Sequence, residues 1–259
     1  MSKVISIVTV VKNNAASIES TIRSVLGQTY HHYEFIIVDG FSTDGTFEIV
    51  QKYSNKISKL VRSEPLGIYS AMNVGLSHAS GDYVVFLNSG DEFKDSSTLE
   101  KAFGSQNFPK ATFVYGDSIV KFGERSYYKK SKRVTEYLSG MPFIHQSVFI
   151  KMDWHRINPY NIEVGIAADL ELVCRAINQG ESFEALKFPI SIFSSGGISD
   201  TSRIKSLLSF RKTLLIYKGS LVANFFFCKK ILSYLIAGFF KAVMPKTLIN
   251  YVRLKRTSW

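Results

Sequence analysis

Hydrophobic positions in the first hundred residues alternate between two spacings. Residues 4–11 are a continuous apolar, β-branched run, as expected of a strand buried on both faces. Three further strands are predicted at residues 34–38, 57–61 and 83–87. Between these strands, apolar residues recur at helical spacing, over residues 18–26, 46–53 and 68–79. This order predicts an α/β fold with a mostly parallel, Rossmann-like sheet and helices on both of its faces.

The pattern changes after about residue 112. Residues 113–120 and 125–129 alternate like a hairpin or a pair of edge strands, and residues 143–150 are strand-like. A helix with one apolar face is expected over residues 169–179. We therefore expect a domain over residues 1–200 with two halves, residues 1–110 and residues 111–200.

The C-terminal segment, residues 201–259, is both basic and apolar. The chain has a net charge of +11, but its last acidic residue is Asp200, and twelve Lys and Arg follow it. Residues 1–200 therefore carry 20 basic residues against all 21 acidic ones. The most hydrophobic part of the chain is residues 221–243, which Lys229 and Lys230 interrupt. Its longest clean apolar stretch, residues 231–240, is too short for a bilayer core, which needs about 20 residues.

Three interpretations of this segment are open. Amphipathic helices lying on an anionic membrane surface would explain apolar stretches with basic residues at their margins. Nucleic-acid binding would favour aromatic residues interleaved with base-reading polar groups, a pattern that the segment lacks. Helices packed on the domain, with solvated lysines, are the third. We favour the membrane surface and expect no nucleic-acid partner.

The expected location is the cytoplasm, with the protein peripheral on the inner face of the cell membrane. The apolar residues 4–11 are too few for a signal sequence, and no cleavage site follows them. The two cysteines, Cys174 and Cys228, form no disulfide pattern.

The candidate binding residues lie where the predicted strands end, since ligands of open parallel sheets bind at the carboxyl ends of the strands. Asp39 ends the second strand, and Asp91 follows the fourth. Residues 10–14 after the first strand contain no glycine, which argues against a dinucleotide fingerprint, and no Walker A pattern is present. A nucleotide diphosphate held without these loops needs another source of positive charge. A divalent cation, Mn²⁺ or Mg²⁺, on Asp91 would supply it.

Several ordered motifs carry a resemblance to a known family. They read SIVTVVKN at 6–13, IIVDGFSTDGT at 36–46, EPLGIYSAMNVG at 64–75, GDYVVFLNSGD at 81–91, FIHQS at 143–147, IAADLEL at 166–172 and GGIS at 196–199. Over about residues 3–200 the chain resembles family 2 glycosyltransferases, and it is similar to bacterial enzymes that build O-antigen, capsule and colanic acid.

The resemblance implies a GT-A fold and an inverting transfer of a sugar from a nucleotide-diphosphate donor. The nucleotide sugar would bind in residues 1–110, and the acceptor and the catalytic groups would lie in residues 111–200. By matched position, the implied roles are donor contacts for Thr9, Asn13, Asp39, Asn73, Asn88 and Asp91, a metal ligand in Asp91, acceptor contacts for His145 and Gln146, and the catalytic base in Asp169.

The chain departs from the family pattern at two places. Relatives often carry aspartates at the positions of Asn88 and Gly90, and here only Asp91 remains. Relatives also tend to have Asp where this chain has Ser70. The first departure predicts weak metal binding, with the donor's phosphates supplying much of the coordination.

Each candidate residue also has a plainer interpretation. Asp39 could cap a turn before Gly40, Asp169 could be an ordinary N-cap, and His145 could be a core residue. Glu171 is best explained by an i,i+4 ion pair with Arg175.

The leading prediction is an enzyme that transfers a sugar, with UDP as the favoured nucleotide, to a lipid-linked or glycan acceptor in bacterial surface polysaccharide synthesis. Two alternatives stay open. A sugar-phosphate nucleotidyltransferase would need a glycine-rich basic loop after the first strand, and residues 11–14 do not provide one. A membrane-peripheral scaffold that only retains the fold would not need Asp39, Asp91 and Asp169.

Overall fold

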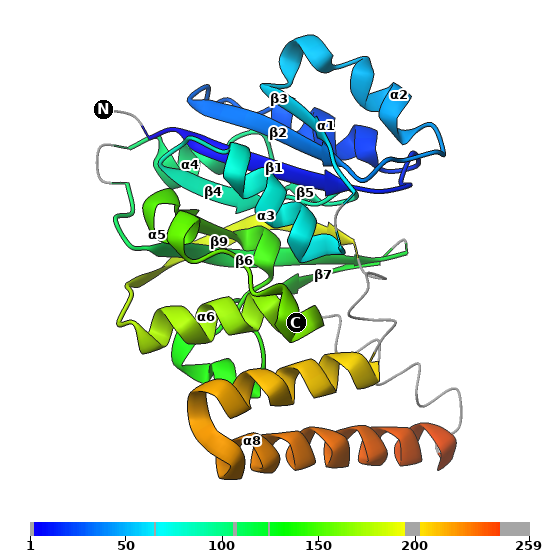
Figure 1. Cartoon of the computed structure of the whole chain (residues 1–259), viewed down its shortest axis with the longest axis vertical. Coiled ribbons are helices and arrows are strands. Elements are labelled where there is room, and N and C mark those ends of the chain that lie inside the picture. Colours follow the sequence, from blue (N-terminus) through cyan, green and yellow to red (C-terminus); the bar gives the residue numbers. More distant parts are fainter. Residues whose placement is uncertain (1–2, 65, 106–107, 124, 195–202, 244–259) are drawn as a thin grey trace.

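The computed structural model describes residues 3–64, 66–105, 108–123, 125–194 and 203–243 (Figure 1). The strands are β1 (Ile5–Val11), β2 (Tyr33–Asp39), β3 (Lys59–Arg62), β4 (Tyr83–Phe86), β5 (Glu92–Phe93), β6 (Phe113–Phe122), β7 (Arg125–Lys129), β8 (Val148–Lys151) and β9 (Phe183–Ser194). The α-helices are α1 (Ile18–Leu26), α2 (Thr46–Gln51), α3 (Ile68–His78), α4 (Thr98–Phe103), α5 (Met152–Ile157), α6 (Ala168–Asn178) and α8 (Arg203–Val243). The 3₁₀ helices are η1 (Ser54–Lys56), η2 (Val134–Ser139), η3 (His145–Ser147) and η4 (Ile162–Ala167).

The described strands form one sheet in the order β3-β2-β1-β4-β8-β6-β9-β5, with β7 paired to β6. The first four strands are parallel, as predicted, with Ile7 of β1 opposite Phe35 of β2 and Val85 of β4. Beyond β4 the sheet is mixed: β8 is antiparallel to β4 and β6, whereas β9 is parallel to β6. The sheet is therefore mostly parallel only in its N-terminal half.

Helices cover both faces of the sheet, as the sequence predicts. Alternate residues of β1 point to opposite sides: Val8 packs in the core beneath α3 and α6, and Ile7 packs in the core beneath α1 and α4. Helix α3 lies so close to β1 that a Cβ added at Gly75 would come within 2.3 Å of Val8. Glycine is therefore required at the point where this helix crosses the sheet.

One predicted strand differs from the structure. Residues 145–147 form the 3₁₀ turn η3, and the strand β8 begins only at Val148. The side chain of Gln146 and the hydroxyl of Ser147 are both buried and bonded to other segments. These tertiary contacts override the apolar spacing that favoured a strand.

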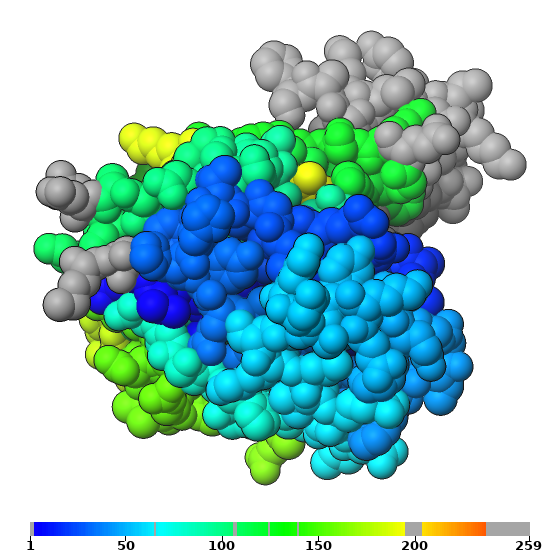
Figure 2. All heavy atoms as spheres, turned by 90° about the horizontal axis from the view of Figure 1, so that it is seen from above, coloured from blue at the N-terminus to red at the C-terminus, as the bar shows by residue number. Residues whose placement is uncertain are grey.

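The basic C-terminal segment forms a pair of helices. The helical geometry of α8 is broken at Gly219, with φ of 77° and ψ of 174°, and the chain folds back there (Figure 1). We call residues 203–218 the first helix and residues 220–243 the second helix of the pair. Residues 204–236 together are long and apolar enough to cross a membrane by length and composition, but the break at Gly219 divides them. Figure 2 shows the N-terminal elements, blue to cyan, covering the end of the molecule opposite to this pair.

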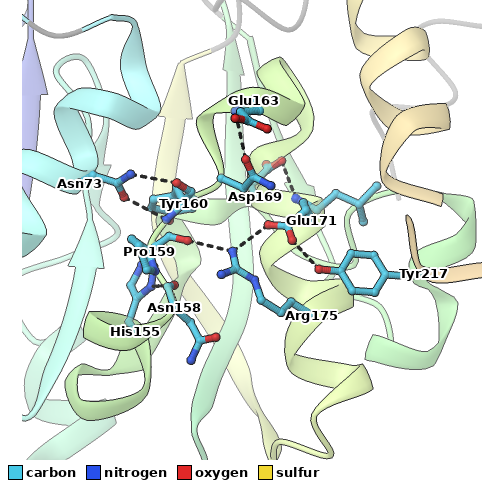
Figure 3. Close-up of polar contacts among 12 residues, drawn as sticks. Asn73, His155, Asn158, Pro159, Tyr160, Glu163, Asp169, Glu171, Arg175 and Tyr217 are labelled. Carbon is cyan, nitrogen blue, oxygen red and sulfur yellow. Dashed lines mark hydrogen bonds and ion pairs between the residues drawn. The ribbon is translucent and has the colours of Figure 1, made fainter. Parts of the chain in front are cut away.

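The first helix of the pair packs on the domain. Its residues Phe210 and Leu214 are buried in the core shared with α6. The hydroxyl of Tyr217 donates to Glu171 at 2.5 Å, and Glu171 forms the predicted ion pair with Arg175 at 2.8 Å (Figure 3). The packed-helix interpretation is thus correct for this helix.

The second helix packs on the first. Arg211 donates from Nε to Oδ1 of Asn224 at 2.9 Å, and Nζ of Lys230 lies 3.5 Å from the ring centre of Phe210. Several basic residues are therefore used inside the pair rather than offered to solvent. The outward face of the second helix is apolar, with Leu221, Phe225, Leu232 and Leu235 between 58% and 87% exposed.

Candidate active site

The carboxyl end of β2 carries Asp39, whose side chain is fully buried. Its Oδ2 accepts hydrogen bonds from the backbone N–H of Ser42 at 3.1 Å and from Nε of Arg62 at 3.3 Å. Its Oδ1 has no hydrogen-bond partner among the described residues. A buried acceptor without a donor is costly, so this oxygen is a candidate contact for a ligand that brings an N–H group.

Arg62 connects Asp39 to two aromatic rings. Its guanidinium lies 4.0 Å from the ring centre of Phe47 and 4.8 Å from that of Phe41. Phe41 is 48% exposed and has a φ of 55°, a conformation that a bulky residue rarely adopts. The sheet edge beside Asp39 thus presents a ring and a cation to solvent.

The loop after β1 joins this edge to the end of β4. Asn13 accepts the backbone N–H of Thr43 at Oδ1, at 2.9 Å, and its own backbone N–H donates to Ser42 Oγ at 2.9 Å. Asn14 reaches the other way, and its Nδ2 donates to the carbonyl and to Oγ of Ser89, at 3.2 and 3.0 Å. The hydrogen bonds of Asn13, a predicted donor contact, therefore fix the loop around Asp39.

A cavity of about 420 Å³ opens beside Ser89, between the end of β4 and the starts of α3 and α6. It brings together side chains from five separate parts of the chain. The predicted site residues that line it are Asn88, Asp91, His145, Gln146 and Asp169.

Four predicted donor residues do not line this cavity: Asn13 and Asp39 belong to the neighbouring sheet edge described above, and Thr9 and Asn73 bond other segments of the fold. Thr9 is fully buried in β1, and its hydroxyl donates to the carbonyl of Leu87 at 2.6 Å. Asn73 bonds the backbone of Tyr160 at both ends of its amide, at 2.9 Å each (Figure 3). Both side chains therefore hold segments of the fold together.

Asp91 lies on the floor of the cavity and is 4% exposed. Its Oδ2 accepts Nε2 of Gln146 at 2.6 Å, and its Oδ1 accepts the backbone N–H of Ser194 at 3.1 Å. Burial raises the pKa of Asp91 to about 7, although these two hydrogen bonds act to lower it. The carboxylate is thus poised to exchange a proton for another cation near neutral pH.

Asn88 and His145 form a pair beside Asp91. Nδ2 of Asn88 donates to Nε2 of His145 at 2.9 Å, which leaves the imidazole proton on Nδ1. Burial lowers the pKa of His145 to about 4, so the ring is neutral at physiological pH. His145 can therefore orient a ligand but brings no positive charge to the cavity.

Asp169 also lines the cavity, from the first turn of α6. The N-cap of that helix is Ala167, so the interpretation of Asp169 as an ordinary N-cap is wrong. Its Oδ1 accepts the backbone N–H of Leu170 at 2.7 Å. Burial raises the pKa of Asp169 to about 6, and the Leu170 hydrogen bond acts against this rise. A carboxylate with a pKa near neutrality is suited to take a proton in a reaction.

The sequence profile of the family described as Glycosyl transferase family 2 matches residues 6–162, more than half of the chain. The chain belongs to glycosyl transferase family 2. The glycosyltransferase matches a PGL/p-HBAD biosynthesis glycosyltransferase of Mycobacterium bovis at 28% identity over 179 residues, covering 67% of this chain and 69% of the relative.

Two further relatives match shorter stretches of this glycosyltransferase. A putative teichuronic acid biosynthesis glycosyltransferase of Bacillus subtilis, TuaG, is 42% identical over 100 residues, which are 38% of this chain and 39% of TuaG. A cholesterol galactosyltransferase of Borreliella burgdorferi is 29% identical over 120 residues, 46% of this chain and 33% of that protein.

Solved structures confirm the GT-A fold. S. aureus TarS 1–349 in complex with UDP matches with a TM-score of 0.65 and 18% identity, over 94% of this chain and 76% of TarS 1–349. The mannosyltransferase PcManGT from Pyrobaculum calidifontis, in complex with GDP-Man and Mn²⁺, matches with a TM-score of 0.65 and 17% identity, over 99% of this chain and 85% of the other.

The cavity of the glycosyltransferase has a donor set that fits a hard divalent cation. Asp91 supplies one carboxylate, and two amide oxygens near it, Oδ1 of Asn88 and Oε1 of Gln146, are buried without a hydrogen-bond partner among the described residues. Oxygen ligands of this kind suit Mg²⁺ and Mn²⁺. Among the described residues that line the cavity there is no Lys or Arg, so they offer no other charge to neutralise a diphosphate.

Sequence reasoning missed several residues that build this site. Arg62 ends β3, and the rule that places ligands at strand ends could have found it. Asn14 bonds Ser89, 75 residues away, and the hydroxyl of Tyr69 donates to the carbonyl of Ile166, 97 residues away, at 3.0 Å. One sequence carries no signal for contacts between such distant segments. The motif at 196–199 lies outside the described residues.

Proposed function

We propose that this glycosyltransferase transfers a sugar from a UDP-sugar to a lipid-linked or glycan acceptor, with inversion, in bacterial surface polysaccharide synthesis. One observation carries the proposal: a single cavity is lined both by Asp169 and by Asp91 with Asn88 and Gln146. The teichuronic acid enzyme TuaG among its relatives supports the polysaccharide context.

Asp169 fits the role of general base. In a single displacement, its carboxylate takes the proton of an acceptor hydroxyl while that oxygen bonds to the anomeric carbon. The bond from the anomeric carbon to the diphosphate oxygen breaks at the same time, and the configuration inverts. The position of Asp169 in the first turn of α6 also favours its charged form through the helix dipole.

The group of residues around Asp91 fits the donor's diphosphate. Asp91, Asn88 and Gln146 would hold a Mn²⁺ or Mg²⁺ ion, which when bound neutralises charge on the leaving diphosphate. The nucleoside would lie over the edge beside Asp39, whose free Oδ1 can accept one N–H group, such as N3–H of uracil. His145 and Gln146 would also face the acceptor.

The pH dependence of the enzyme should report Asp169. A base must be deprotonated, so kcat/KM is expected to fall as pH drops through about 6 and to level off above it. Measuring kcat/KM from pH 5 to 8 at saturating metal checks this. A profile that stays flat through pH 6, with activity intact, would remove Asp169 from the proton transfer.

A panel of nucleotide sugars tests the proposed reaction. Incubation with UDP-, GDP- and dTDP-sugars and a bacterial membrane extract should release a nucleoside diphosphate, fastest from a UDP-sugar. Release of inorganic diphosphate from a nucleoside triphosphate and a sugar phosphate would instead indicate the nucleotidyltransferase. Absence of turnover with every donor would favour the scaffold.

The helix pair supports a location on the inner face of the membrane. The outward stripe of the second helix, Leu221, Phe225, Leu232 and Leu235, would lie in the lipid interface. Exposed lysines such as Lys205 and Lys229 would meet anionic headgroups, at about 1 kcal/mol each. A relative named for transfer to cholesterol shows that an apolar acceptor occurs in the wider family, which supports a lipid-linked acceptor here.

Liposome flotation tests this location. The full chain should float with vesicles that contain anionic lipid, and the bound fraction should fall at about 1 M salt, where the Debye length is about 3 Å. Changing Leu221 and Phe225 together to Asp should abolish flotation. Phe122→Asp is the matched control, because Phe122 is 71% exposed but lies at the end of β6. Equal flotation of the double variant would contradict the assigned face.

A further inference from the structure

Asp169 has a close neighbour on another helix that the proposed reaction does not yet use. Tyr69 lies in the first turn of α3 and lines the same cavity as Asp169. Its hydroxyl donates to the carbonyl of Ile166 at 3.0 Å, and Ile166 stands just before Asp169, where η4 leads into α6. A phenol hydroxyl is thus held beside the carboxyl group of the candidate base.

The hydroxyl of Tyr69 and the carboxyl group of Asp169 act on each other's proton affinity. Burial raises the pKa of Asp169 to about 6, while the backbone N–H of Leu170 and the hydroxyl of Tyr69 act to lower it. Burial raises the pKa of Tyr69 well above its ordinary value, and the negative charge of Asp169 raises it further. Tyr69 therefore keeps its proton at physiological pH, which makes it a hydrogen-bond donor and not a second base.

The ring of Tyr69 is held in place by packing. It lies against the ring of Tyr160, with ring centres 5.1 Å apart and planes inclined at 43°. One turn further along α3, the amide of Asn73 bonds the backbone of Tyr160 at both ends, at 2.9 Å each (Figure 3). The hydroxyl can therefore change its acceptor by rotation of the O–H bond while the ring stays in place.

We infer that Tyr69 is the positioning residue of the general base: its hydroxyl donates to Asp169 when that carboxylate is charged, and to the carbonyl of Ile166 when Asp169 holds a proton. The inference rests on the proposed transfer reaction and adds a residue to it. A carboxylate can accept several hydrogen bonds, so Leu170 and Tyr69 orient it while an acceptor hydroxyl approaches. In the reaction the acceptor's proton moves to Asp169, and Tyr69 keeps its own.

Most of the other titratable groups around Asp169 keep one charge between pH 5 and 8. Burial raises the pKa of Tyr160, raises that of Cys174 to about 12 and lowers that of His145 to about 4. Tyr160 and His145 line a second, small cavity together with Asp169. Burial raises the pKa of Asp91 to about 7, but Asp91 is unchanged in the variants compared below, so its titration affects them equally.

The pH dependence of Tyr69→Phe tests this role. The variant keeps the ring that packs on Tyr160 and should fold, which thermal unfolding checks. Without the hydroxyl the protonated form of Asp169 is favoured, so the fall of kcat/KM moves to higher pH. We expect kcat/KM to drop about 10-fold at pH 5 but to stay within about threefold of the unchanged enzyme at pH 8, since one hydrogen bond to a charged group is lost. A loss of equal size at every pH would indicate a structural role and overturn the inference.

Tyr53→Phe is the matched control. The hydroxyl of Tyr53 donates to the carboxylate of Glu19 at 2.6 Å, which is the same kind of hydrogen bond, and Tyr53 is not among the residues that line the cavity. This variant should keep the pH profile of the unchanged enzyme.

The titration of Asp169 can also be followed without turnover. With aspartate labelled by ¹³C at the side-chain carboxyl, the NMR signal that is absent from Asp169→Asn reports Asp169. Its midpoint should lie at higher pH in Tyr69→Phe than in the unchanged enzyme. A shifted midpoint without turnover of any nucleotide sugar would mean that the transfer reaction alone is wrong. Turnover with the same midpoint in both proteins would mean that the role of Tyr69 alone is wrong.

Discussion

Asp169→Asn is expected to lower turnover by about 10²- to 10⁴-fold, the range that a general base contributes. The amide keeps the size of the carboxylate and can still accept the backbone N–H of Leu170 at its oxygen. It cannot take a proton from an acceptor hydroxyl. Turnover is measured as nucleoside diphosphate released at saturating donor and acceptor.

The thermal stability of Asp169→Asn shows whether a loss of turnover comes from the chemistry or from unfolding. Burial raises the pKa of Asp169 from 3.8 to about 6, so the folded state binds more protons than the unfolded state in that window. The contribution of Asp169 to the free energy of unfolding is therefore fully present below pH 3.8 and is lost as pH rises through about 6. At pH 7.5 the Asp169→Asn variant should therefore unfold at the same temperature as the unchanged enzyme or higher.

Glu163→Gln, an exposed change in η4, is the matched control and should keep wild-type turnover. Wild-type turnover by Asp169→Asn would contradict its role.

Asp91→Asn should lower activity by about 10²- to 10³-fold, because Asp91 is the only carboxylate besides Asp169 among the described residues that line the cavity. It should also abolish the part of UDP binding that depends on Mn²⁺, which calorimetry with and without the metal measures separately from activity. Since burial raises the pKa of Asp91 to about 7, Mn²⁺-dependent binding by the unchanged enzyme should tighten as pH rises from 6 to 8.

Glu92→Gln is the matched control for Asp91→Asn. Glu92 is the next residue, and its ion pair with Lys121 spans 3.8 Å at a partly exposed site, where such pairs contribute little. This variant should keep Mn²⁺-dependent binding. Full activity of the unchanged enzyme in EDTA would show instead that Asp91 serves a metal-free site.

The parallel half of the fold could be predicted because β1 and β4 are buried along their whole length and β2 along most of it. Their sequences are rich in Val, Ile and Phe, as is typical of strands covered on both faces. Strand β9 was not predicted, since its sequence mixes Lys187, Pro189 and Ser191 with apolar residues. Its pairing with β6 follows from long-range contacts that local spacing does not encode.

The candidate site could be predicted where a carboxylate side chain also stands within a motif of the family. Asp91 and Asp169 follow motifs that place them in one cavity, and the structure brings them there. The contact of Asn73 with the backbone of Tyr160, 87 residues away, could not be predicted, because one sequence carries no signal for it. The docking of α8 was equally hidden: Tyr217 and Glu171 are both ordinary helix residues until the fold joins them.

The configuration of the product tests the central claim most directly. The enzyme is incubated with the donor found in the nucleotide-sugar panel and its acceptor, and the anomeric coupling constant of the new glycoside is measured by proton NMR. Single displacement assisted by Asp169 predicts the configuration opposite to that of the donor, with Asp169→Asn forming the product about 10²- to 10⁴-fold more slowly. A product that keeps the donor's configuration, or one that Asp169→Asn forms at the wild-type rate, would contradict the account.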